Sequence, residues 1–226
     1  MSKAEQIGSE DVGPGREHLV LSDGFKLLAK CCRQIAQKIR THRKTVEYTT
    51  STTGLTPVSD GDFVKVFRKA NAAGGIVVGP LSTALLDTLH GDLAEVDYDS
   101  AQAACALLRK AVNQLIGANE KFVSMQPPSG AAELRTATVA FLNAGLECLE
   151  EFAESVIAIA ENEGQVIDKD KSFNIKWHND YIAEALDVVS AHWESYERAI
   201  KAKNPAGCLL LLIPLLGVPF AGMLTL

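Results

Sequence analysis

One short stretch of this sequence holds the residue types of a metal or acid–base site. His178 is followed by Asp180, Glu184 and Asp187, and helical spacing would bring several of these side chains to one face. The spacing differs from the His-Glu-x-x-His pattern of zinc enzymes, and no second cluster of ligands accompanies it. We therefore expect a solvated polar face here. An enzyme that uses His178 is the weakest of three hypotheses about the function.

The other candidates for chemistry also have structural explanations. The glycine-rich stretch 74–80 lacks the Gly-Lys-Ser/Thr that phosphate binding requires, so a helix break is expected there. No Gly-x-Ser-x-Gly pattern and no Cys–His–Asn signature occurs. The five cysteines include no Cys-x-x-Cys pair. Adjacent Cys31 and Cys32 could be a lipidation or vicinal-thiol site, but they are expected to fill a helix face. The sequence predicts a protein that is not an enzyme, with no catalytic residue, cofactor or metal.

The composition is that of an ordinary helical globular protein. Hydrophobic residues make up 47% and charged residues 22% of the 226 residues, which excludes disorder throughout the chain. Aromatic residues are 6%, and such a core suits helices better than sheets. The net charge of −6 argues against a nucleic-acid partner, because phosphate neutralisation needs a basic surface. The polar first 18 residues lack the apolar stretch of a signal peptide.

Apolar residues recur at helical spacing along most of the chain. The clearest stripe crosses 99–117, where Ala101, Ala104, Cys105, Leu108, Ala111, Val112, Leu115 and Ile116 share a face. Further helices are expected over 19–40, 60–73, 81–93, 131–160 and 171–202, and no strand is expected. The predicted fold class is all-α: an antiparallel bundle of five to six helices, with a flexible N-terminal tail and a hydrophobic C-terminal segment.

Two of these helices have faces that can be assigned in advance. In 131–160, Glu147, Glu150, Glu151 and Glu154 are expected to form an acidic outer face. In 171–202, the inward face is expected to hold Trp177, Tyr181, Ala185, Val188, Val189, His192, Trp193, Tyr196 and Ile200.

Three regions are expected along the chain. Residues 1–57 form an N-terminal extension with a disordered tail, a basic amphipathic helix and a Ser/Thr-rich linker over 45–61. The basic helix could lie on an anionic membrane or an acidic partner, although a solvated face is favoured. Residues 58–203 form the bundle, and 204–226 form the hydrophobic C-terminal segment.

The last nineteen residues, 208–226, carry no charge and just reach the length of a membrane span. Pro214 and Pro219 count against a regular helix, although membrane helices tolerate proline. Three interpretations stay open: Leu209–Leu226 crosses or contacts a membrane, it packs on the bundle, or it reflects an error in the gene model.

Several short motifs between residues 58 and 196 resemble the fungal hydrophobic surface-binding protein family, also called cell wall galactomannoproteins. In that family a helix ends in a small polar run and Gly-Gly, an acidic-Ser start precedes a helix closing on Lys-Phe, and the last helix holds spaced aromatic residues. The matching positions are Lys69–Gly75, Asp97–Ala101, Lys121–Phe122 and Asp180–Ala185, with Trp193 and Tyr196 after them.

The resemblance implies a secreted or cell wall protein without catalytic residues that binds a fatty acid, another lipid or a hydrophobic surface through an apolar interior. Small residues such as Ala104 and Gly145 along the stripes could leave a void for an acyl chain. Periodicity then nominates a cavity lining of Leu108, Val112, Leu115, Phe141, Cys148, Phe152, Val189 and Trp193.

The alternative is a cytoplasmic or membrane-anchored adaptor whose bundle binds a partner protein while the C-terminal segment lies in a membrane. The interior distinguishes the two, because a lipid carrier needs a continuous apolar cavity of roughly 300 Å³ or more. An adaptor would instead have a tight core and an exposed apolar groove.

Overall fold

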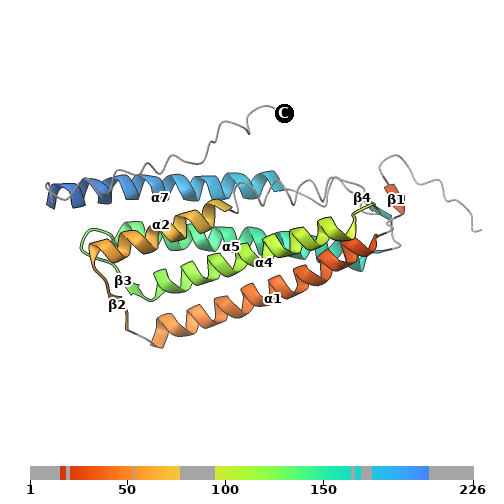
Figure 1. Cartoon of the computed structure of the whole chain (residues 1–226), viewed down its shortest axis with the longest axis horizontal. Helices are drawn as coiled ribbons and strands as arrows, with labels where there is room; N and C mark the ends of the chain where they lie inside the picture. Colours follow the sequence, from red (N-terminus) through yellow and green to blue (C-terminus); the bar gives the residue numbers. More distant parts are fainter. Residues whose placement is uncertain are drawn as a thin grey trace, which may run out of the picture.

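A computed structural model shows a chain that is predominantly helical (Figure 1). The structure describes residues 16–18, 21–52, 54–76, 95–163, 166–168 and 175–203, with side chains within 21–46, 54–75, 95–163 and 180–203. The helices in these ranges are α1 (Asp23–Thr52), α2 (Asp60–Ile76), α4 (Tyr98–Val123), α5 (Ala132–Glu161) and α7 (Ile175–Lys203). The predicted all-α class is confirmed.

The helices lie side by side along the long axis of the molecule, as Figure 1 shows. α1, α4 and α7 run in one direction, and α2 and α5 run in the other. α5 lies against α1, α2, α4 and α7, and α4 lies against α1, α2 and α5. α5 is therefore the element on which the positions of the others depend.

Local sequence explains where α4 and α5 begin and end. The Asp97 carboxylate accepts a hydrogen bond of 2.8 Å from the Ser100 amide and caps the start of α4. Ser124 ends α4, and its hydroxyl donates to the carbonyl of Glu120. The turn before α5 contains Gly130, whose φ of +87° is costly for a residue with a side chain.

The first helix is longer than expected and belongs to the assembly. α1 continues to Thr52, so the prediction of a linker is wrong for residues 45–52. Phe25, Leu28 and Ile39 are fully buried in the same core as α4 and α5. The expected boundary at residue 57 placed α1 outside the bundle. This is wrong for α1, because its apolar face is covered by α4 and α5.

Two short pairs of strands also correct the expectation of no strand. β1 (Arg16–His18) pairs antiparallel with β4 (Val166–Asp168), and Glu17 faces Ile167 in the register. β2 (Thr56–Pro57) pairs in parallel with β3 (Met125–Gln126). Pairs of two or three residues lack the alternating pattern by which sequence reveals a strand.

An aromatic cluster joins α7 to α2 and α4. Trp193 stacks on Phe67 with ring centroids 4.6 Å apart. Phe63 makes edge contacts with Phe122 at 5.8 Å and with Tyr196 at 5.5 Å. The Tyr196 hydroxyl also donates a 2.6 Å hydrogen bond to the Asp60 carboxylate. α7 is thus held by directional aromatic contacts in addition to apolar burial.

The face predicted for α7 is partly wrong. Val189, Trp193, Tyr196 and Ile200 are buried as expected, and Ile182 joins them. Tyr181 and Val188, which were expected inward, are 43% and 50% exposed. The stripe assigned from sequence was wider than the contact that α7 makes with α5 and α2.

Some expected elements fall outside the described residues. These are the N-terminal tail before residue 16, the helix around Leu81, Leu85, Leu89 and Leu93, and the C-terminal segment after Lys203. No described helix is both long enough and apolar enough to cross a membrane.

The close approach of α2 to α5 predicts opposite effects of alanine at two adjacent glycines. A Cβ at Gly74 would overlap the ring of buried Phe141, whereas a Cβ at Gly75 would meet nothing within 4 Å. We expect Gly74→Ala to lower the free energy of unfolding by about 1–3 kcal/mol. Gly75→Ala should leave it equal or raise it by up to about 1 kcal/mol. Urea denaturation followed by circular dichroism measures both, and equal effects would contradict this packing.

The Tyr196 hydroxyl predicts a pH-dependent contribution to stability. Burial, and then the hydrogen bond to Asp60, raise the pKa of Tyr196 above its ordinary value of 10.0. The folded state therefore favours the protonated phenol, and this contribution is present below pH 10 and is lost as the pH rises further. We expect Tyr196→Phe to cost about 1 kcal/mol at neutral pH and to show a shallower loss of stability above pH 10.

The matched control for that experiment is Tyr98→Phe, because Tyr98 is 56% exposed. This variant should keep the stability and the alkaline profile of the unmodified protein. If both variants behave alike, the Tyr196–Asp60 hydrogen bond contributes nothing measurable.

Candidate functional site

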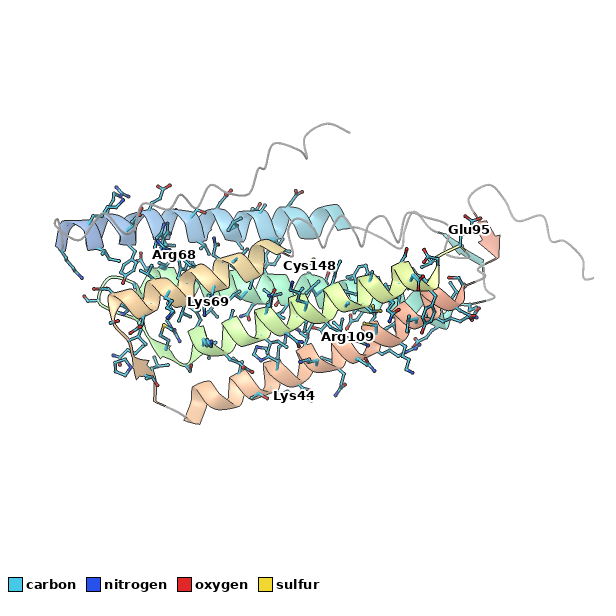
Figure 2. All side chains as sticks on the ribbon, in the orientation of Figure 1. Lys44, Arg68, Lys69, Glu95, Arg109 and Cys148 are labelled. Atoms are coloured by element: carbon cyan, nitrogen blue, oxygen red, sulfur yellow. The ribbon has the colours of Figure 1, made fainter. Side chains whose placement is uncertain are left out.

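The residues predicted to line a cavity come together in the core. Leu108, Val112 and Leu115 lie on α4, while Phe141, Cys148 and Phe152 lie on α5, and α7 supplies Val189 and Trp193. All are buried except Cys148, which is partly buried and packs against the same core. Figure 2 labels Cys148 on α5. The sequence thus identified core positions at these sites.

The core is filled by side chains at several of these positions. A side chain that lined a void large enough for a water molecule would have some surface that a water molecule can touch. Leu108 and Leu115 have no accessible surface, and Phe141 and Val189 have 1% each. Trp193 lies flat on Phe67. At these positions the described interior has no room for an acyl chain without rearrangement.

A charged groove lies on the surface between α1 and α5. Its volume is about 330 Å³, and both charged and apolar residues line it. Its lining consists of Arg33, Ala36, Arg40, Glu154, Ile157, Ala158 and Glu161. The Arg40 guanidinium bonds the Glu154 carboxylate, and that of Arg33 lies 3.7 Å from Glu161. Because each cation of the groove has an acidic neighbour, the groove has no net charge with which to select an ion.

The groove belongs to a wider set of ion pairs that joins α1 to α5. Glu150 is 7% exposed, accepts a hydrogen bond from Arg40 at 3.0 Å and forms an ion pair with Arg43 at 2.6 Å. Lys26 pairs with Glu163 at 2.9 Å. The basic face of α1 therefore lies largely against α5. The expected acidic outer face of α5 needs correction at Glu150, which is buried because two guanidinium groups neutralise it.

A polar chain crosses from buried His42 on α1 through buried Asn119 on α4 to exposed Asn143 on α5. His42 Nε2 lies 3.2 Å from Asn119 Oδ1, and Asn119 Nδ2 donates to Asn143 Oδ1 at 2.9 Å. Since a carbonyl oxygen only accepts, Nε2 of His42 carries the hydrogen. His42 Nδ1 has no hydrogen-bond partner, and it lies 3.5 Å from a Glu120 carboxylate oxygen.

Three thiols gather where α1 meets α4, which the sequence analysis missed. Cys31, Cys32 and Cys105 are all buried. The Cys31 thiol donates to the Cys105 carbonyl with a sulfur–oxygen distance of 3.9 Å. Cys31 and Cys105 are 74 residues apart, so no local spacing could have revealed this contact.

The proposed acid–base cluster finds no support among the described residues. The side chain of His178 lies outside them, and those of Asp180, Glu184 and Asp187 are exposed on α7. Among the described side chains, no group of three or more histidine, cysteine or acidic residues could hold a metal ion.

Comparisons with known proteins add no relative. No protein family, no curated protein and no solved structure matches this chain.

The burial of Glu150 predicts unequal effects of two similar substitutions on α5. Glu150→Gln removes the charge that two arginines contact, and we expect it to lower the free energy of unfolding by about 1–3 kcal/mol. Glu147 is 49% exposed and lies 3.9 Å from Arg43, so Glu147→Gln should cost less than about 0.5 kcal/mol. Urea denaturation measures both values. A larger cost at Glu147 would show that burial does not set the strength of these pairs.

Proposed function

We propose that this chain is a non-enzymatic antiparallel helical bundle that attaches to a lipid membrane through its hydrophobic C-terminal segment, residues 208–226. The helical part then serves as a rigid body that carries a protein-binding surface at the membrane. The observation that carries this proposal is the packed core, which leaves the apolar C-terminal sequence as the part with the chemistry for contact with lipid.

The packing of the described helices supports this assignment. Leu108 and Leu115 have no accessible surface, and the aromatic rings of Phe67 and Trp193 stack directly. A carrier with a resident lipid would need a continuous apolar cavity of roughly 300 Å³ or more. The groove of about 330 Å³ between α1 and α5 lies on the surface and has charged walls, so it does not meet that need.

The sequence around the end of α7 also supports membrane contact. Lys201 and Lys203 are the basic residues of the last helical turn. The uncharged stretch 208–226 follows within a few residues. Basic side chains beside an apolar segment favour the anionic headgroups of a membrane surface. Transfer of that segment from water to lipid is favourable by about 0.8 kcal/mol for each buried CH₂ group.

The resemblance to hydrophobic surface-binding proteins remains compatible with a contact at a lipid surface. The resemblance implies a lipid that is held inside the bundle, whereas the packed core favours contact with lipid through the C-terminal segment. A resident fatty acid therefore stays the second interpretation.

Charged substitutions in the C-terminal segment test the proposal. We expect the full chain to float with vesicles of phosphatidylcholine and phosphatidylserine. A double variant, Leu212→Arg with Phe220→Arg, should lose most of this binding, because two buried charges oppose insertion. The control is Ala199→Arg, on the exposed face of α7, which should float like the unmodified chain. Flotation of the double variant at the level of the unmodified chain would contradict the proposal.

Native mass spectrometry of the purified chain separates the two interpretations. We expect that no lipid copurifies with the chain at a stoichiometric ratio. A fatty acid that copurifies at one to one, and is retained by the double variant, would favour a lipid held within the bundle.

A further inference from the structure

The contact between α1 and α4 brings two cysteines from distant parts of the chain together. α1 and α4 run in parallel, because Gln34 meets Arg109 and Lys38 meets Asn113 at corresponding steps along the two helices. Cys31 and Cys105 occupy the same register one turn earlier. The contact does not depend on the C-terminal segment or on any lipid.

A disulfide requires the backbones of its two cysteines to lie close together. The hydrogen bond from the Cys31 thiol to the Cys105 carbonyl oxygen shows that the side chain of one residue reaches the backbone of the other across this interface.

Cys31 and Cys105 meet across the interface, since the Cys31 sulfur lies 3.9 Å from the Cys105 carbonyl oxygen, and their thiols have different chemical environments. Interaction with the Cys105 thiol and the positive charge of Arg109 lower the pKa of Cys31. The same contact, together with burial, raises the pKa of Cys105. Cys31 is therefore the thiol that ionises first, and Cys105 is adjacent to it.

We propose that Cys31 and Cys105 form a reversible disulfide between α1 and α4 when the chain meets a peroxide. The Cys31 thiolate attacks one peroxide oxygen, the O–O bond breaks, and the departing hydroxide takes a proton and leaves as water. The sulfur of Cys105 then attacks the sulfur of Cys31, and the S–O bond breaks. The second hydroxide takes the Cys105 proton and also leaves as water. The two thiols supply the two electrons that reduce the peroxide.

The other described cysteines are poor competitors for this reaction. Cys31 and Cys32 are both buried, but burial raises the pKa of Cys32, whereas the pKa of Cys31 is lowered. Successive residues of a helix point in directions about 100° apart, so a Cys31–Cys32 bond would require the helix to unwind. Burial, and then the charge of Glu151, raise the pKa of Cys148 to about 11, so that little thiolate is present at neutral pH.

The test oxidises the full chain with hydrogen peroxide at pH 7.5, using a Cys208→Ser background to exclude bonds through the C-terminal segment. The product is alkylated under denaturing conditions, digested without reductant and analysed by mass spectrometry. We expect a cross-linked peptide pair lighter by two hydrogen atoms, which dithiothreitol separates. Trypsin releases Cys31 and Cys32 in the same tripeptide, Cys-Cys-Arg, so variants must assign the bond.

Matched variants make the assignment. Cys31→Ala and Cys105→Ala should abolish the cross-link, whereas Cys32→Ala and Cys148→Ala should keep it. The oxidised chain should also melt at a higher temperature than the reduced chain, and the shift should vanish with dithiothreitol. This melting comparison uses the unsubstituted core and does not depend on how the variants fold. Retention of the cross-link in Cys105→Ala, oxidation of Cys148 alone, or irreversible sulfinic acid without a cross-link would each overturn the proposal.

Discussion

The contacts of α5 with α1, α2, α4 and α7 are the constraint on which the structure depends. A helix with neighbours on several sides must be apolar on several faces, and buried residues of α5 indeed range from Leu134 to Ile159. Glu150 interrupts this surface, and its burial is tolerated because Arg40 and Arg43 both contact its carboxylate. The position and register of α1 are tied to α5 through that contact.

The position of α1 has two consequences that reach beyond stability. Its basic side chains lie largely against acidic residues of α5, so less of its charge is available to attract a membrane or an acidic partner. Its contact with α4 also brings Cys31 to Cys105. One helix, through two different interfaces, therefore accounts both for the neutralised surface and for the thiol pair.

Two features bear on where this protein would contact lipid: the packed core and the apolar C-terminal sequence. Stacked aromatic rings and side chains without accessible surface occupy several of the positions at which the lining of a lipid cavity was expected. Apolar sequence remains at the end of the chain, directly after the basic last turn of α7. The proposed membrane contact uses the apolar character of that sequence.

The sequence by itself determined the helical class, the buried face of α4 and the buried positions Phe141 and Phe152 of α5. Every residue of the stripe from Ala101 to Ile116 is buried as predicted, because 3.6-residue periodicity is a local property of one helix. Tertiary structure alone decided the length of α1, the exposure of Tyr181 and Val188, the burial of Glu150 and the meeting of Cys31 with Cys105. Each of these depends on which helix lies opposite, and no periodicity within one segment carries that information. The tight packing at Leu108, Leu115 and Trp193 has the same origin, since periodicity shows which residues turn inward but not whether their side chains meet.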